Sequence, residues 1–205
     1  MKKLLFVLGL SCCSPAKLET KKDTGSTLIP PEPPLEPVGV MPADDCQQID
    51  IGDKACNFRL LDQNGEIWEL YDHTGNVVVL DFSAVWCYPC QLAAAETQRL
   101  QDEYSADGVQ IVTVLIDGPT PGEEPTDYDL ERWTSTHNIT TAPVLQGSRE
   151  KMLDAQDGSV AVPGVTGYLL NAYPTYLYID KDMKFYSGHV GFSEEYIRQK
   201  IEEGL

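Results

Sequence analysis

Two cysteines separated by two residues are the side chains of this sequence best suited to chemistry. They are Cys87 and Cys90, in the stretch Trp86-Cys87-Tyr88-Pro89-Cys90. A pair of thiols at this spacing can close and open a disulfide bond reversibly. In such an exchange we expect Cys87 to attack a substrate disulfide as a thiolate and Cys90 to release the product. The spacing therefore predicts dithiol redox chemistry.

The segments on either side of the cysteines predict a strand-to-helix junction. Residues 77–82 form a short apolar run, rich in β-branched side chains, that is typical of a buried strand in a parallel sheet. Residues 91–100 are rich in strong helix formers. Cys87 should therefore lie at a helix N-terminus, where free N–H groups and the helix dipole favour a thiolate and lower the thiol pKa. Cys90 should lie one turn into the helix and face inward.

The remaining pattern predicts one α/β domain. The chain has 205 residues, 42% of them hydrophobic, which is enough for one core. The helix between strands 77–82 and 109–117 is long enough for a right-handed crossover. The other predicted elements are a hairpin over 58–61 and 67–70 with an Asn64-Gly65 turn, a helix over 127–137, an extended piece at 144–145, a short helix over 148–155, a surface loop over 157–167, strands over 173–180 and 184–190, and a helix over 193–203.

The N-terminal part of the chain predicts export. Residues 1–13 combine two lysines with an apolar run that is too short to span a bilayer, and the run ends at Cys12 and Cys13. This ending resembles the lipobox of bacterial lipoproteins, in which one of these cysteines is acylated; an ordinary secreted protein and an uncleaved anchor are the alternatives. Residues 14–45 are polar and then proline-dense, which predicts a disordered linker, or else a ligand for a proline-recognition module. Residues 46–205 form the predicted domain, located outside the cytoplasm, in the periplasm or cell envelope.

The charge of the chain limits its partners. The formal net charge is −17 at pH 7. A surface this acidic repels phosphate backbones and anionic lipid headgroups, so binding to nucleic acid and electrostatic docking to a membrane are both disfavoured. We expect neutral or basic protein partners and contact with a membrane only through the N-terminal lipid anchor.

The other cysteines and the histidines predict structure rather than chemistry. In an exported protein Cys46 and Cys56 indicate a structural disulfide. The alternative, a zinc site that also uses Cys87 and Cys90, is disfavoured because the first spacing is too long. The three histidines, at positions 73, 137 and 189, are spread along the chain and are expected at the surface or in packing. We therefore expect no metal and no cofactor.

The order of the elements and two motifs resemble the thioredoxin fold, in particular its extracytoplasmic TlpA and ResA branch. Residues 81–90, with the sequence DFSAVWCYPC, match the thioredoxin pattern, and residues 173–175, Tyr-Pro-Thr, match the cis-proline loop of the family. The resemblance covers about residues 47–205. It implies an α/β, three-layer fold with a central mixed sheet, helices on both faces and an N-terminal β-hairpin.

The resemblance also implies roles for residues around the dithiol. Asp81 matches the buried acid behind the resolving cysteine and could accept the Cys90 proton, although an ordinary solvated carboxylate at a strand end is the alternative. Pro174 would be cis and lie beside the cysteines, so that the backbone of Tyr173 could pair with an extended substrate peptide. The predicted substrate-binding set is Trp86, Tyr88, Pro89, Tyr173 and Thr175.

Three positions depart from the family pattern. Many members of this branch have a glutamate and then a proline after the second cysteine, where this chain has Ala93 and Ala95. Thioredoxins pair the buried acid with a lysine on the next strand, and the corresponding position here is Thr113. The direction of electron flow is therefore left open by the motif.

These observations together predict a thiol-disulfide oxidoreductase. We expect it to reduce disulfides of exported proteins, as in cytochrome c maturation, with electrons from an upstream thiol donor. One alternative is a peroxiredoxin-like peroxide reductase, but Ala84 stands where those enzymes place a threonine. The other is a non-catalytic module that binds client proteins and in which the Cys87–Cys90 disulfide is structural.

Overall fold

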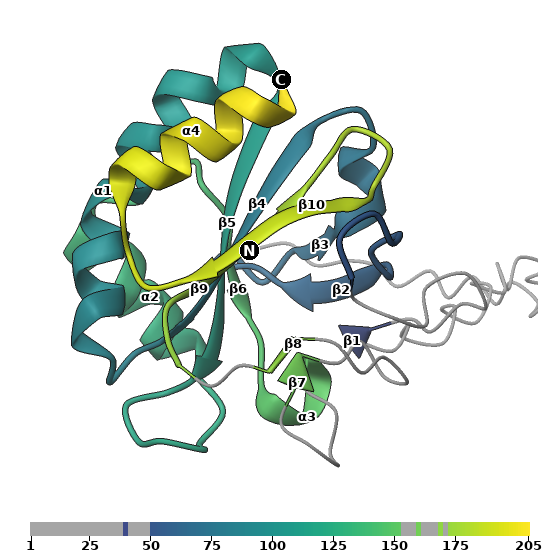
Figure 1. Ribbon diagram of the computed structural model, residues 1–205. Coiled ribbons are helices and arrows are strands. Elements are labelled where there is room, and N and C mark those ends of the chain that lie inside the picture. The colour runs from purple at the N-terminus through teal and green to yellow at the C-terminus, as the bar shows by residue number, and fades with distance from the viewer. Residues whose placement is uncertain (1–38, 41–49, 153–158, 161–167, 170–171) are drawn as a thin grey trace, which may run out of the picture. The chain divides into compact units, whose positions relative to one another are not determined.

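A five-stranded mixed sheet forms the centre of the domain. The computed structural model describes residues 39–40, 50–152, 159–160, 168–169 and 172–205. β5 runs parallel to β4 and β6, whereas β9 runs antiparallel to β4 and β10 (Figure 1). The strands, in their order across the sheet, are β10 (Phe185–Val190), β9 (Thr175–Ile179), β4 (Val77–Ala84), β5 (Val109–Asp117) and β6 (Val144–Gln146).

Strand β4 is buried along its whole length, which explains the run of apolar residues in its sequence. Its side chains alternate between the two faces of the sheet. Val77 and Val79 pack among helices on one face, whereas Val78 and Leu80 pack into a separate core on the other. The same alternation places Asp81 on the helical face.

Three helices cover that face: α1 (Tyr88–Tyr104), α2 (Asp127–His137) and α4 (Glu194–Gly204). Helix α2 begins at a capping box, in which Thr126 and Asp129 satisfy each other's backbone N–H groups. Helix α4 begins at Ser193, whose hydroxyl accepts a hydrogen bond from the Tyr196 N–H. The predicted start of each helix is thereby confirmed.

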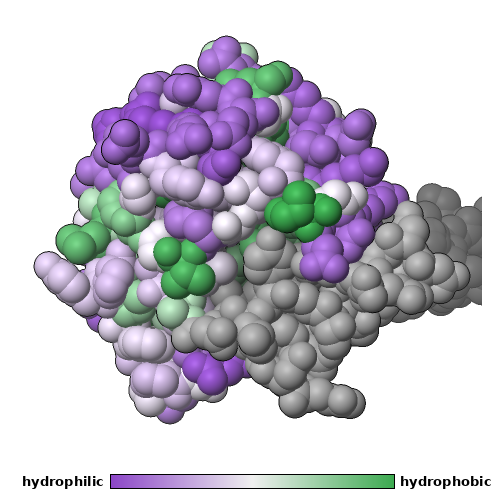
Figure 2. Space-filling view, viewed as in Figure 1, coloured by the Kyte–Doolittle hydropathy of each residue, from purple (hydrophilic) through white to green (hydrophobic). Residues whose placement is uncertain are grey.

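Helix α4 packs beside α1 and covers the sheet with one apolar side. Ile197 of α4 is buried against the sheet, and Arg198 pairs with Glu103 of α1. Arg99 of α1 in turn pairs with Glu194. Hydrophilic residues dominate the part of the surface formed by these two helices (Figure 2).

The opposite face is covered by a hairpin and two short helical turns. These elements are β2 (Phe58–Leu61), β3 (Ile67–Glu69), η1 (Leu70–His73) and α3 (Arg149–Met152). The predicted hairpin is confirmed, and Gly65 provides the positive φ angle, 76°, that its turn requires. The central sheet with helices on both faces and an N-terminal hairpin is therefore confirmed.

Two short strand pairs add to this architecture. β1 (Gly39–Val40) pairs antiparallel with β2, so the span predicted as a linker contains a two-residue strand. β7 (Ser159–Val160) pairs with β8 (Tyr168–Leu169), so the predicted loop 157–167 contains a strand as well. Backbone hydrogen bonding creates such short pairs without a periodic side-chain pattern, so they could not be predicted from the sequence.

Several predictions fall outside the described residues. The signal and lipobox over residues 1–13, with Cys12 and Cys13, lie there, as does Cys46. Within the ranges that the structure describes, no helix has the length and apolar character needed to cross a membrane.

Candidate active site

Cys87 and Cys90 are joined in a disulfide, with their Cα atoms 5.3 Å apart. Cys87 is the N-cap of α1, and its sulfur accepts a hydrogen bond from the Cys90 N–H at 3.2 Å. Pro89 lies in the first turn, where its missing N–H costs no helical hydrogen bond. The predicted positions of both cysteines, one at the helix N-terminus and one buried in the first turn, are confirmed.

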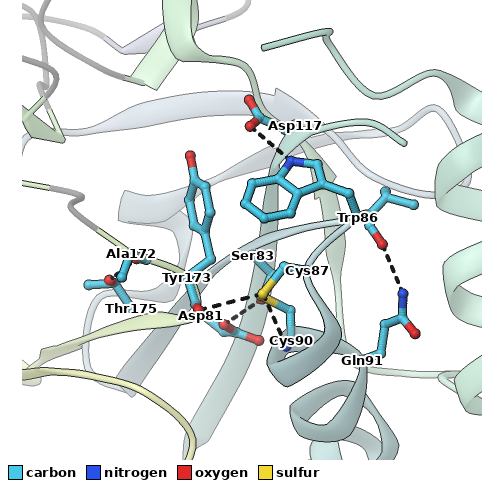
Figure 3. Close-up of a disulfide and its surroundings, with 11 residues drawn as sticks. Asp81, Ser83, Trp86, Cys87, Cys90, Gln91, Asp117, Ala172, Tyr173 and Thr175 are labelled. Carbon is cyan, nitrogen blue, oxygen red and sulfur yellow. Dashed lines mark hydrogen bonds between the residues drawn. A yellow bond between two sulfur atoms is a disulfide. The ribbon is translucent and has the colours of Figure 1, made fainter. Parts of the chain in front are cut away.

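The loop before β9 lies against Cys87 (Figure 3). The Tyr173–Pro174 peptide bond is cis, as predicted. The Tyr173 carbonyl oxygen lies 3.5 Å from the Cys87 sulfur, and the Thr175 hydroxyl donates to the Ala172 carbonyl at 2.8 Å. The chain therefore brings together two segments that are far apart in sequence, and it presents a backbone carbonyl next to the sulfur.

Asp81 is buried on β4, on the sheet face that α1 covers. The Ser83 hydroxyl donates to its Oδ1 atom at 2.8 Å, while Oδ2 has no hydrogen-bond partner among the described residues. Burial raises the pKa of Asp81 to about 7, and the Ser83 hydrogen bond offsets only part of that effect. The solvated alternative is wrong, and the carboxyl group can hold or release a proton near neutral pH.

Thr113 is the residue opposite Asp81 on β5. The predicted correspondence with the lysine position of thioredoxins is therefore consistent with the strand register. The Thr113 hydroxyl is buried and has no hydrogen-bond partner among the described residues. No cation on β5 stabilises the Asp81 carboxylate from this position, which agrees with the raised pKa of Asp81.

An ion pair between a buried carboxylate and a half-exposed arginine lies on the other side of the dithiol, and the sequence pattern did not predict it. Asp117, at the end of β5, is buried and receives two hydrogen bonds from Arg149 of α3, at 2.6 and 2.7 Å. The Trp86 indole N–H donates to the same carboxylate at 3.1 Å, and its ring packs edge-on to Tyr173. Burial alone would raise the pKa of Asp117, but the hydrogen bonds from Arg149 and Trp86 outweigh it and lower the pKa.

Asp117 could have been found from the sequence, whereas Arg149 could not. The carboxyl ends of β4 and β5 must meet at one edge of the sheet, so an acid at the end of β5 belongs beside the cysteines. Arg149 lies 32 residues further on, in a helix of four residues with no periodic pattern to orient it.

Exposed side chains stand directly beside the buried dithiol. Trp86, Tyr88 and Pro89 are exposed, with Tyr88 at 69% exposure, although both cysteines are buried. The substrate-binding role predicted for Trp86 and Tyr88 stays a prediction.

The histidines pack against aromatic rings. His73 stacks on Trp68, His137 lies edge-on to Trp133, and His189 stacks on Tyr176. Within the described ranges, His, Cys, Asp and Glu side chains form no group of three or more suited to a metal ion. Cys56 is buried, but Cys46 lies outside the described residues, so their disulfide stays a prediction.

This arrangement can perform disulfide exchange. A helix N-terminus lies at Cys87, a carboxyl group with a pKa near 7 lies on the sheet beneath the same helix, and the Tyr173 backbone carbonyl borders the sulfur. Figure 3 shows how Asp81, Cys87 and Cys90 lie close to Tyr173 in the loop before β9.

Comparisons with known proteins agree with this chemistry. A family model described as the AhpC/TSA family matches residues 51–186. The thiol-disulfide oxidoreductase ResA of Halalkalibacterium halodurans is 26% identical over 152 residues, which cover 74% of this chain and 73% of the relative. The thioredoxin-like protein YneN of Bacillus subtilis is 27% identical over 152 residues, which cover 74% of this chain and 78% of the relative.

Two solved structures also resemble the chain. One, from Chlorobium tepidum, is identified as a thiol:disulfide interchange protein DsbE; it is 29% identical, with a TM-score of 0.59, and the match covers 77% of this chain and 99% of that one. The exposed lipoprotein thioredoxin Etrx1 of Streptococcus pneumoniae is 29% identical, with a TM-score of 0.56, and the match covers 72% of this chain and 98% of that one. Both similarities support the predicted thioredoxin-like fold.

Proposed function

Because the chain belongs to the AhpC/TSA family, we propose that its Cys87–Cys90 pair makes it a thiol-disulfide oxidoreductase that reduces disulfides of exported proteins. The observation that carries this proposal is the disulfide at the N-terminus of α1, bordered by the cis Tyr173–Pro174 loop and by buried Asp81. The names of the similar proteins ResA and DsbE support the same activity.

The reaction begins with the reduced dithiol. The Cys87 thiolate attacks one sulfur of the client disulfide, forms a mixed disulfide and expels the other client sulfur as a thiolate. The Cys90 thiolate then attacks the Cys87 sulfur, so that the Cys87–Cys90 disulfide forms and the second client thiolate leaves. Two electrons pass to the client, and a dithiol donor must return two electrons to the oxidised pair.

Asp81 serves the second step in this proposal. Cys90 is buried and must lose its proton before it can attack. A carboxylate whose pKa lies at about 7 can accept that proton at neutral pH and return it to the departing client thiolate, directly or through water. The Tyr173 backbone carbonyl, which lies beside Cys87, is placed to receive an N–H donor from an extended client chain.

Trapping of the mixed disulfide tests the proposal. In full-length protein with Cys90→Ser, Cys87 has no resolving partner, so client proteins should accumulate as covalent adducts that are released by dithiothreitol. The control is the double variant Cys87→Ser, Cys90→Ser, which keeps every other cysteine. Adducts that persist in the double variant, or no adducts in the single variant together with no reduction of insulin by the wild type, would overturn the assignment.

The proposed location is the cell envelope, with a lipid on Cys12 or Cys13. The charged and apolar composition of residues 1–13 supports it, as does the description of Etrx1 as an exposed lipoprotein. Metabolic labelling with a palmitate analogue should mark the wild type, and one of the two variants Cys12→Ala and Cys13→Ala should lose the label. Labelling of neither the wild type nor the variants would contradict a lipid anchor.

A further inference from the structure

A pocket of about 130 Å³ adjoins the active-site turn on the side of α2. Val85 and Gln91 form one wall, and the Gln91 amide donates to the Val85 carbonyl at 3.0 Å. Val85 lies two residues before Cys87 and Gln91 four residues after it, so the pocket borders the turn that carries the reactive sulfur. In Figure 3, Gln91 and Tyr173 lie on opposite sides of the disulfide.

An arginine without an acidic partner lines this pocket. Arg132 is exposed, and no carboxylate of the described residues lies within ion-pair distance of its guanidinium. The guanidinium lies over the ring of Tyr128, 5.8 Å from the ring centroid. Elsewhere in the described chain the guanidinium groups of Arg99, Arg149 and Arg198 each pair with carboxylates. In a protein of net charge −17, an unpaired cation beside the active site is available to an anionic ligand.

A buried hydrogen-bond donor lines the same pocket. Trp133 is only 4% exposed, and its indole N–H has no acceptor among the described residues. A buried donor without an acceptor costs free energy, and the Trp133 ring must shift before a ligand oxygen in the pocket can accept from it. Asp129 also lines the pocket, but its Oδ2 atom already accepts hydrogen bonds from the Thr126 N–H and hydroxyl.

The remaining titratable group at the pocket is His137. It packs edge-on to the Trp133 ring, and burial lowers its pKa. It is therefore neutral at pH 7, so Arg132 carries the positive charge at the pocket, and the Asp129 carboxylate on the same lining opposes it. Together the guanidinium of Arg132, the Trp133 indole N–H and the exposed Gln91 side chain offer donors that suit a carboxylate.

We propose that this pocket binds a carboxylate of the substrate, and that it favours disulfides with an acidic group close to the attacked cysteine. The inference rests on the proposed disulfide reduction. The carboxylate can belong to a Glu or Asp side chain of a client protein or to a small disulfide such as oxidised glutathione. The two sources share the same recognition chemistry, and the experiment separates them.

Peptide pairs provide the main test. Disulfide peptides that differ only by Glu or Gln are compared, with the variable residue placed in turn at each of the positions flanking the cysteine. The wild type should reduce the best Glu peptide with a kcat/KM about five- to tenfold above that of its Gln counterpart, since a partly exposed charged hydrogen bond has about that effect. Arg132→Gln should abolish this ratio. The matched control Arg99→Gln, with the same charge change on the exposed side of α1, should keep it.

A binding measurement provides a readout that does not depend on activity. In ¹⁵N-labelled oxidised protein, titration with N-acetylglutamate α-amide, whose only carboxylate is the side chain, should shift the Trp133 indole resonance, whereas N-acetylglutamine α-amide, which has no carboxylate, should not. Trp133→Phe assigns that resonance, because it removes one of three indole signals. If the wild type also reduces oxidised glutathione with a higher kcat/KM than cystamine, the pocket accepts the carboxylate of a small disulfide. If only the peptides show a preference, the carboxylate belongs to a client side chain.

Two results distinguish the two proposals. If the wild type reduces Glu and Gln peptides equally at every position and the indole resonance does not move, the carboxylate pocket is wrong while disulfide reduction stands. If the wild type reduces none of the peptides, the proposed function itself fails. A preference for Glu that survives Arg132→Gln would also overturn the pocket.

Discussion

At the scale of single residues, the site depends on a carboxyl group held where water cannot reach it. Asp81 accepts one hydrogen bond, from Ser83, and burial brings its pKa to about 7. The folded protein therefore keeps a destabilising group in its core above neutral pH, which agrees with a functional reason for its presence.

Asp81→Asn should stabilise the protein in a pH-dependent way. The folded-state pKa of Asp81 is raised above the unfolded value near 3.8, so the folded state holds a proton that the unfolded state loses between pH 4 and 7. Wild-type stability thus falls over this range, and the variant should gain about 2–4 kcal/mol at pH 8 but little at pH 4. Urea unfolding of the oxidised protein at both pH values measures this difference.

The control for that experiment is Asp102→Asn on the exposed side of α1, which makes the same change of charge. An equal gain of stability for Asp81→Asn at pH 4 and pH 8 would contradict a raised pKa. In the Asp81→Asn variant the resolving step should also be slower. Its rate is measured as the decay of the mixed disulfide after rapid mixing.

At the scale of secondary structure, the cysteines depend on where β4 and β5 end. Both strands are buried and apolar, so their position, and that of the helix after β4, could be predicted from the sequence. The place of Thr113 was expected from the resemblance to thioredoxins, and the strand register puts it opposite Asp81. The Asp117–Arg149 pair could not be predicted, because no sequence pattern relates a strand end to a four-residue helix.

Removal of the Arg149 charge should destabilise the domain and loosen Trp86. In Arg149→Gln the buried Asp117 carboxylate loses its ion pair, and we expect a loss of about 1–3 kcal/mol at pH 7, smaller than for a fully buried pair because Arg149 is half exposed. The pKa of Asp117 is lowered in the folded state, so this loss should shrink as the pH falls below about 4.

Thermal unfolding at pH 7 and pH 3.5, together with tryptophan fluorescence, measures both effects. Lys151→Gln is the matched control, since it removes a charge from the same helix and breaks only the surface pair with Glu124. A loss of stability in Arg149→Gln that is as large at pH 3.5 as at pH 7 would contradict an origin in the Asp117 charge.

At the scale of the whole molecule, charge and surface composition set the range of partners. The net charge is −17, and exposed hydrophobic residues such as Trp86, Tyr88 and Leu92 lie at or near the start of α1. The view in Figure 2 shows hydrophobic residues as separate spots among hydrophilic ones. Approach over long distances therefore favours neutral or basic clients, while Arg132 acts on a single carboxylate at short range.

Salt should affect basic and acidic substrates in opposite directions. Raising the ionic strength from about 20 to about 300 mM should lower kcat/KM for a basic disulfide protein several-fold and raise it for an acidic one, because screening weakens steering by the protein's field. Stopped-flow reduction assays with two substrates of similar size and opposite charge measure this trend. The same change of kcat/KM for both substrates would show that steering by net charge is absent.

A redox titration of the Cys87–Cys90 pair tests the central claim most directly. Equilibration of the full-length protein with defined thiol buffers, followed by alkylation and mass analysis, gives the reduction potential of this pair. A dithiol that cycles should titrate between about −120 and −270 mV, the range of known exchange proteins. A potential well below about −300 mV would mark a bond too stable to cycle, and the pair would then be a structural disulfide.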